Sequence, residues 1–228
     1  MLEIRNFSKS YSKGKNVVED ISLKVNNGEI YGFVGHNGAG KTTTIKSIVG
    51  ILDFQQGDIL IDNMSIKNES LECKKVMAYI PDNPDIYEAL TGIYKVSKEQ
   101  REELIRLYGD RFELTPYLGD LISSYSHGMK QKLVVISALI HKPKLLVLDE
   151  PFVGLDPKAA YTLKEIMREI CNEGSAIFFS SHVLEVVEKL CDRVAIIKNG
   201  HIVAEGKTAE VKGNSSLEHV FLELIDNE

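Results

Sequence analysis

The sequence has no tryptophan, and its three cysteines, Cys73, Cys171 and Cys191, lie far apart. No C-x-x-C pair occurs, so the pattern indicates neither a zinc site nor a disulfide framework and fits a reducing compartment. The longest apolar run, "LVVISALI" (133–140), has eight residues, whereas a helix that crosses a bilayer needs about 20. The N-terminus also lacks the pattern of a secretory signal. If the protein acts at a membrane, we expect another chain to supply the membrane-spanning part.

An excess of basic residues is missing too. The chain has 27 Lys and Arg against 33 Asp and Glu, a net charge of −6, which gives no indication of a nucleic-acid partner. With 43% hydrophobic and 26% charged residues, the composition is that of a folded protein and not of a disordered chain. A length of 228 residues allows one domain that carries a small subdomain.

The first 52 residues predict strands followed by a glycine-containing loop and a helix. Two runs, "LEIRNFSKSY" and "VEDISLKV", read as strands joined by the polar turn "SKGK", and form an N-terminal antiparallel β subdomain. "EIYGFVG" (29–35) predicts a further strand that ends in glycine. "KTTTIKSIVGIL" then has apolar residues at helical spacing.

The remainder predicts an α/β core with a helical insertion. "KLLVLDEP" (144–151) and "SAIFFSSH" (175–182) are continuous apolar runs, typical of parallel strands buried on both faces. "RVAIIKNGHIVAEG" reads as a hairpin that turns at Asn199 and Gly200. The intervening residues 85–135 are rich in Glu, Lys and Arg and predict a small α-helical subdomain. We therefore expect a single domain over 1–228, with its core at about 1–84 and 136–228.

The C-terminal tail predicts an amphipathic helix. Its apolar residues make one helix face, and these are Leu217, Val220, Phe221, Leu224 and Ile225. Ser215 and Glu218 have the spacing of a capping box. We expect this face to pack on its own domain, with contact to a partner protein as the alternative.

A phosphate-binding loop is the strongest motif. Residues 35–42, "GHNGAGKT", match G-x-x-x-x-G-K-[ST], in which glycines let backbone N–H groups surround phosphate oxygens. Lys41 would contact the β- and γ-phosphates, Thr42 would offer a hydroxyl to Mg²⁺, and the following helix points its positive end at the same anion. The nucleotide-binding residues predicted here are Gly35, His36, Asn37, Gly38, Ala39, Gly40, Lys41, Thr42 and Thr43, with no chemical role for the His36 side chain.

Two carboxylates follow the strand "LLVLDE", at the end where α/β sheets place ligands. Asp149 would hold Mg²⁺ directly or through water. Glu150 would accept a proton from the attacking water, or orient that water. His182 ends the next strand and could reach the γ-phosphate.

With these motifs in this order, the chain resembles the ATP-binding cassette (ABC) ATPases along essentially its whole length. Within them it resembles the nucleotide-binding subunit of a bacterial ABC transporter, and "YSHGMKQKL" is similar to export systems. In "YSHGMKQ", Tyr125, Ser126, His127 and Gly128 take the places of the family's L-S-G-G signature. The resemblance implies that Ser126 and the backbone of Gly128 bind the γ-phosphate of ATP held by a second ABC subunit, with a helix N-terminus behind them.

Further roles come from the resemblance alone. It implies that Tyr11 stacks on adenine, that Asp156 in "GLDP" belongs to a loop at the dimer interface, and that Lys41 and His182 join Glu150 in catalysis. Two departures are notable. Asp82 stands where the family has a glutamine, although its carboxylate can still meet Mg²⁺ or its waters. The segment after Gly92 is short by about ten residues, near three helical turns; a deletion or a stretch skipped by the sequence would explain this.

The implied function is ATP hydrolysis that drives a separate transmembrane permease subunit, on the cytoplasmic face of the cell membrane. The partner cassette is either an identical or a different subunit. The alternative is a soluble ABC ATPase, but the 85 residues from Lys41 to Ser126 hold no coiled coil and the chain has one cassette. Another P-loop class, such as a GTPase or a small-molecule kinase, is less favoured, and the N-K-x-D-like motif of a GTPase does not occur. A Ser–His hydrolase lacks a nucleophile elbow.

Overall fold

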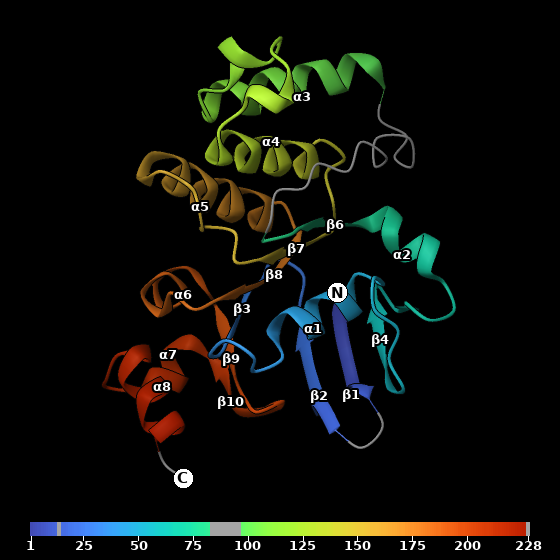
Figure 1. Ribbon diagram of the computed structural model, residues 1–228, viewed down its shortest axis with the longest axis vertical. Helices are drawn as coiled ribbons and strands as arrows, with labels where there is room; N and C mark the ends of the chain where they lie inside the picture. The colour runs from blue at the N-terminus through green and yellow to red at the C-terminus, as the bar shows by residue number, and fades with distance from the viewer. Residues whose placement is uncertain (13–14, 83–96, 227–228) are drawn as a thin grey trace.

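The computed structural model describes residues 1–12, 15–82 and 97–226 (Figure 1). The first sheet is four-stranded and antiparallel, as expected for the N-terminal subdomain. Its strands, in spatial order, are β2 (Lys15–Val25), β1 (Leu2–Ser12), β4 (Gln56–Ile61) and β5 (Met64–Ser65). The sequence predicted only β1 and β2. Leu2 is opposite Val25 on one side and opposite Ile61 on the other, so β1 lies between β2 and β4.

The second sheet has six strands and carries the carboxylates. Its order is β10 (His201–Lys207), β9 (Arg193–Lys198), β3 (Ile30–Val34), β8 (Ala176–Ser181), β7 (Leu145–Asp149) and β6 (Met77–Ile80). All neighbouring pairs are parallel except the hairpin β9–β10. That hairpin turns at Asn199 and Gly200, both with positive φ (49° and 85°), which is the backbone of a two-residue type I′ turn. The predicted α/β fold class is confirmed.

Alternate residues of the central strands face opposite layers. Tyr31, Val147 and Phe178 pack against the four-stranded sheet and α1 (Lys41–Ile48), while Leu148 and Phe179 pack against the other helices. The strands are therefore buried on both faces, which explains their continuous apolar sequences. The helices of the second face include α5 (Pro157–Asn172), α6 (Leu184–Leu190) and α8 (Leu217–Asp226). The shorter helix α2 (Ser70–Val76) connects β5 of the first sheet to β6 of the second. The short helix α7 (Thr208–Lys212) lies between β10 and α8.

The helical part lies at one end of the molecule (Figure 1). It contains α3 (Lys98–Arg111), the 3₁₀ turns η2 (Thr115–Tyr117) and η3 (Ile122–Ser124), and α4 (His127–Leu139). α4 runs four residues past the expected subdomain limit at 135 and packs on β6. Residues 85–96, and with them most of the short segment after Gly92, lie outside the described residues. The division into core and subdomain thus stays a prediction.

The C-terminal helix packs on its own domain, as predicted. Leu217 is fully buried, and Val220, Phe221 and Leu224 pack against the core beside it. The predicted cap is wrong: Oγ of Ser216, not of Ser215, accepts the N–H of His219 at 3.1 Å. The reason is that the helix begins at Leu217, so that Ser216 is the residue directly before it. Among the described residues, no helix has both the length and the apolar character needed to span a bilayer.

Candidate functional site

The loop between β3 and α1 is tightly packed because three of its residues have no side chain. A Cβ on Gly35 would lie 2.5 Å from the carbonyl oxygen of Ile197, closer than any side chain tolerates. Gly38 and Gly40 have φ of 83° and 113°, a region that only glycine enters at low cost. Gly40 is the residue before α1 and begins the helix. The glycine pattern therefore encodes the backbone shape of this loop.

Lys41 points back along the loop into the site. Its Nζ donates to the carbonyl oxygens of Gly35 (2.7 Å) and His36 (3.3 Å), and the residue is 7% exposed. The same Nζ lies 3.7 Å from Oε1 of Glu150. A cation held here can contact both an anion bound in the loop and the carboxylate of Glu150, which directly follows β7. Thr42, the next residue, is exposed.

Tyr11 reaches the phosphate loop from the other sheet. Its hydroxyl lies 3.2 Å from Oγ1 of Thr43, and the residue is 60% exposed. Nζ of Lys9 lies 5.3 Å from the centre of the ring. An exposed ring next to a phosphate loop offers a flat apolar surface for a base. The structure thus brings Tyr11 to the loop, while its stacking role stays a prediction.

Asp149 is almost completely buried at the end of β7. It is 2% exposed, and Oγ of Ser180 donates to its Oδ1 at 2.6 Å. Ser180 also accepts the backbone N–H of Glu150 at 3.2 Å, so one hydroxyl orients both carboxylate residues. Ser180 was not predicted from the sequence. The signal available was its place two residues before His182, since alternate residues of a strand share a face.

Glu150 and His182 contact each other directly. Nδ1 of His182 lies 2.9 Å from Oε2 of Glu150, and the backbone N–H of His182 donates to the same oxygen at 3.2 Å. Glu150 has φ of 49°, an unusual backbone for a residue with a side chain and one that often marks functional positions. The structure therefore unites Lys41, Glu150 and His182, which are far apart in sequence.

Asp82 lies near this cluster, two residues after β6. Partial burial, followed by the negative charges of Asp149 and Glu150, raises the pKa of its carboxyl, while His127 and His182 act in the opposite direction. Oxygen ligands are those that Mg²⁺ prefers. The hydroxyl of Thr42 and the carboxylates of Asp149 and Asp82 fit such an ion chemically, and within the described part of the chain the Asp149 carboxylate accepts a hydrogen bond from Ser180.

The signature residues lie at the start of α4. Ser126 precedes the helix, is exposed, and accepts the N–H of Met129 on its Oγ at 3.2 Å. Gly128 lies in the first turn of the helix. In the part of the chain that the structure describes, no hydrogen bond or ion pair joins Ser126 or Gly128 to residues 35–43. Ser126 is exposed, so the N-terminus of this helix is accessible at the surface of the chain.

Asp156 is engaged within its own chain. Its Oδ1 accepts the N–H of Ala159 and caps α5 (2.8 Å), and its Oδ2 pairs with Nζ of Lys132 on α4 (2.8 Å). The hydrogen bond from Lys132 lowers the pKa of Asp156, and the Ala159 N–H adds to this. Lys132 was not predicted from the sequence. Whether Asp156 contacts a nucleotide or a dimer interface stays a prediction.

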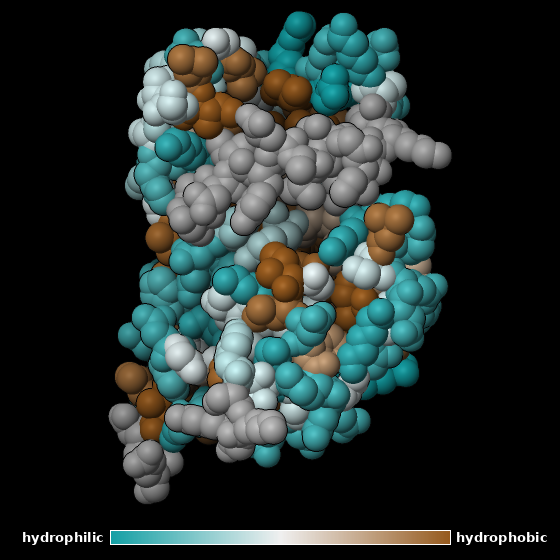
Figure 2. Space-filling model, turned by 45° about the vertical axis from the view of Figure 1, so that its right-hand side comes forward, coloured by the Kyte–Doolittle hydropathy of each residue, from teal (hydrophilic) through white to brown (hydrophobic). Residues whose placement is uncertain are grey.

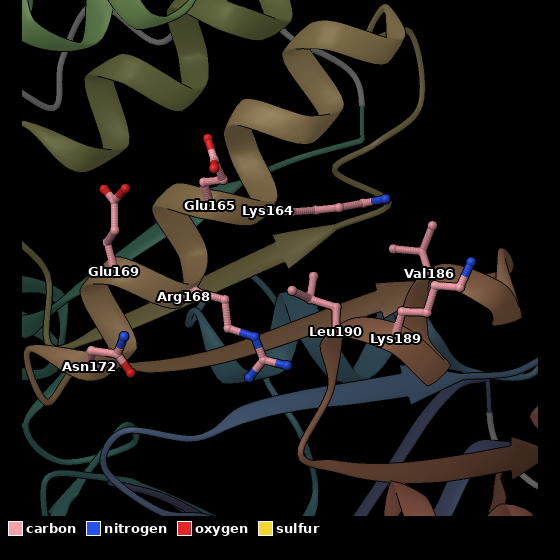
Figure 3. Close-up of a pocket in the computed structure, with 8 residues that line it drawn as sticks. All are labelled: Lys164, Glu165, Arg168, Glu169, Asn172, Val186, Lys189 and Leu190. Carbon is pink, nitrogen blue, oxygen red and sulfur yellow. The ribbon is translucent and has the colours of Figure 1, made fainter.

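A hollow of about 400 Å³ between α5 and α6 lies apart from these residues (Figure 3). It is lined by Lys164, Glu165, Arg168, Glu169, Asn172, Val186, Lys189 and Leu190, and contains no residue predicted to bind nucleotide. Several of its charges are already paired, as in Arg168–Asp192 (3.0 Å) and Lys189–Glu185 (2.6 Å). The hollow therefore does not belong to the phosphate site.

Comparison with known proteins decides the family. Residues 18–153, more than half of the chain, match the family model described as "ABC transporter". The chain belongs to the ABC transporter family. The sequence-based resemblance is thereby confirmed, and the chain is of the ATP-binding subunit type. ABC ATPases hydrolyse ATP as a family.

Individual relatives agree. The chain is 38% identical over 215 residues to the uncharacterized ABC transporter ATP-binding protein YhcH of Bacillus subtilis (strain 168), covering 89% of this chain and 68% of that protein. It is 31% identical over 238 residues to the ABC-type transporter ATP-binding protein EcsA of the same organism, covering 98% of this chain and 96% of that protein. A solved structure described as the ATP binding subunit of an ABC transporter superposes with a TM-score of 0.92 at 34% identity, covering 98% of this chain and 99% of that one.

Proposed function

We propose that this chain binds ATP with Mg²⁺ and hydrolyses it to drive a separate membrane permease. The observation that carries the proposal is the meeting of Lys41, Glu150 and His182, with contacts of 3.7 Å and 2.9 Å to the two oxygens of Glu150. This is the arrangement that phosphoryl transfer requires: a cation for the phosphate oxygens, and a carboxylate held where water attacks.

Each residue has a part in that reaction. The N–H groups of the phosphate loop and Nζ of Lys41 bind the phosphates, which leaves Oε1 of Glu150 free to orient water. His182 fixes the other oxygen, Oε2, through two contacts, so the carboxylate keeps one direction. Glu150 accepts the proton of the attacking water. Thr42, Asp149 and Asp82 hold Mg²⁺, which when bound neutralises charge on the phosphate oxygens.

The site is completed by a second cassette. Ser126 and Gly128 lie at an exposed helix N-terminus that makes no described hydrogen bond or ion pair to the phosphate loop of the same chain. Offered to the nucleotide of another subunit, this helix end and the Ser126 hydroxyl bind its γ-phosphate. Tyr11 stacks on the adenine, and the loop of Asp156 lies at the interface. Two ATP molecules are then enclosed between two copies of this chain or between this chain and a different cassette.

The membrane partner docks on the helical end. Four large apolar side chains are exposed there, Leu107 (49%), Tyr117 (46%), Leu121 (77%) and Ile122 (39%). Figure 2 shows apolar side chains gathered at this end of the molecule. Apolar groups grouped on a surface mark contact sites. We place the protein at the cytoplasmic face of the membrane, held by its permease, with no role for nucleic acid.

Phosphate release tests the catalytic part of the proposal. The purified protein should release phosphate from ATP with Mg²⁺ and stop when EDTA removes the metal. Guanine selectivity, or release that is unchanged by EDTA, would contradict it.

Copurification from detergent-treated membranes tests the proposed membrane partner. The chain should bring a membrane protein with it, and persistent failure to do so would favour a non-transport ABC ATPase.

A further inference from the structure

His127 occupies a signature position where the resembled family has glycine, and its ring contacts a second loop. It is the first residue of α4, after Ser126, and is exposed. A Cβ placed on Gly154 would lie 2.6 Å from Cδ2 and 2.8 Å from Nε2 of His127. The imidazole therefore fills the space that a side chain at 154 would need.

Two more contacts join α4 to the same turn. A Cβ on Gly128 would lie 3.0 Å from the carbonyl oxygen of Gly154, so the two backbones approach closely. Farther along α4, Nζ of Lys132 pairs with Oδ2 of Asp156 at 2.8 Å, and the Lys132 side chain is 15% exposed. The first two turns of α4 and the turn at 154–156 are thus in contact at three successive points.

The turn is continuous with Glu150. The N–H of Val153 donates to the carbonyl oxygen of Glu150 at 3.2 Å, and Gly154 follows directly. Gly154 has φ of 79°, which glycine adopts freely, and Glu150 has φ of 49°, which is unusual for a residue with a side chain. Because the hydrogen bond from Val153 closes the turn onto Glu150, a displacement of the turn acts on the backbone that carries the carboxylate.

We propose that His127 is a positioning residue that locks the signature loop to the turn after Glu150 through its contact with Gly154. The inference rests on the proposed function, in which the signature loop serves one nucleotide and Glu150 another. Through this contact, the signature loop and the turn after Glu150 move as one rigid unit. Loss of the ring leaves the phosphate loop intact, so ATP binding by the single chain is retained while turnover falls.

A double-mutant cycle measures the contact. Gly154→Ala places a methyl group against the ring, and we expect turnover to fall by about tenfold or more, since small misplacements near a reacting group are costly. Alanine at the positive φ of Gly154 also strains the backbone, which is a cost separate from the clash with the ring. In the His127→Ala background the clash is gone, so Gly154→Ala should cost less there. Additive effects of the two substitutions on kcat would overturn the proposal.

Gly174 supplies the matched control. It also has positive φ (99°), but a Cβ there would meet nothing within 4 Å. Gly174→Ala thus carries the backbone cost without the clash, and should combine additively with His127→Ala. Non-additivity with Gly174 as well would show a general loss of stability and remove the support for a specific contact.

Hydrogen exchange separates this inference from the proposed function. In the isolated wild-type chain without nucleotide, the amides of Val153 and Leu155 should exchange slowly, and His127→Ala should speed them by several-fold through easier local opening. Unchanged exchange would overturn the lock even if the protein hydrolyses ATP. If His127→Ala speeds exchange but the wild-type protein hydrolyses no ATP, the proposed function is contradicted. His127 would then have a structural contact and no positioning role.

Discussion

His182 and Glu150 meet at one carboxylate oxygen: Nδ1 of His182 lies 2.9 Å from Oε2, and the backbone N–H of His182 reaches the same atom at 3.2 Å. The other oxygen, Oε1, faces Nζ of Lys41 at 3.7 Å. The end of β7, the end of β8 and the start of α1 therefore converge on one side chain. His182 holds Oε2 at two points and so keeps the carboxylate in one direction, which a group that orients water requires.

His182→Ala should lower the turnover number without abolishing ATP binding. The substitution removes the ring contact to Oε2 and lets Glu150 rotate, and we expect a fall in kcat of about a hundredfold, the usual range for a positioned proton-transfer group. Steady-state phosphate release over a range of ATP concentrations measures kcat and KM separately. His201→Ala, at an exposed histidine on β10, is the control and should leave both unchanged. A normal kcat for His182→Ala would remove this residue from the mechanism.

Lys41→Ala should weaken ATP binding by about tenfold to a hundredfold, the value of losing a charged hydrogen bond. The ammonium group lies inside the loop, where little water replaces it. Titration with a fluorescent ATP analogue gives the dissociation constant. Lys46→Ala tests a lysine of the same helix outside the motif, and should bind normally. Equal affinities for both variants and the wild type would place the phosphates elsewhere.

His141 predicts how stability depends on pH. Burial lowers the pKa of its imidazole to about 4, while hydrogen bonds to the backbone of Met77 and Ser137 oppose the shift. In the unfolded chain the pKa is about 6.5. Between these values the unfolded state binds a proton that the folded state does not. Stability is thus intact above pH 6.5 and falls as the pH drops toward 4, by up to about 3 kcal/mol.

Urea unfolding at pH 7 and at pH 5 checks this dependence. His141→Gln cannot take up the proton, so its stability should change less between the two pH values than that of the wild type. His219→Gln, at an exposed histidine of α8, should retain the wild-type dependence. Identical pH dependence for His141→Gln and the wild type would show that the burial of His141 is not what limits acid stability.

The parts of the site that the sequence predicted are those encoded by neighbouring residues. The glycines of 35–40 specify a backbone shape within six positions, and the apolar runs before Asp149 and His182 specify strands buried on both faces. These features need no knowledge of the rest of the chain, and the structure has the loop and the strands where they were expected.

The parts that were missed depend on contacts between distant residues. Ser180 orients Asp149 only because β7 and β8 are paired with these two residues opposite each other. Lys132 reaches Asp156 only because α4 packs beside the start of α5. The cap of α8 was misplaced by one residue, since Ser215 and Ser216 are both suitable caps and the helix start decides between them.

The most direct test of the account is the mass in solution of Glu150→Gln, by light scattering, without nucleotide and with ATP and Mg²⁺. The substitution keeps the shape of the side chain but removes the proton acceptor, so ATP should bind and persist while turnover falls by at least about a hundredfold. We predict a monomer without nucleotide and a dimer with ATP, and a weaker dimer when Ser126→Ala is added. A monomer that demonstrably holds ATP would contradict self-pairing of this chain, and would leave a different cassette as the subunit whose site Ser126 and Gly128 complete.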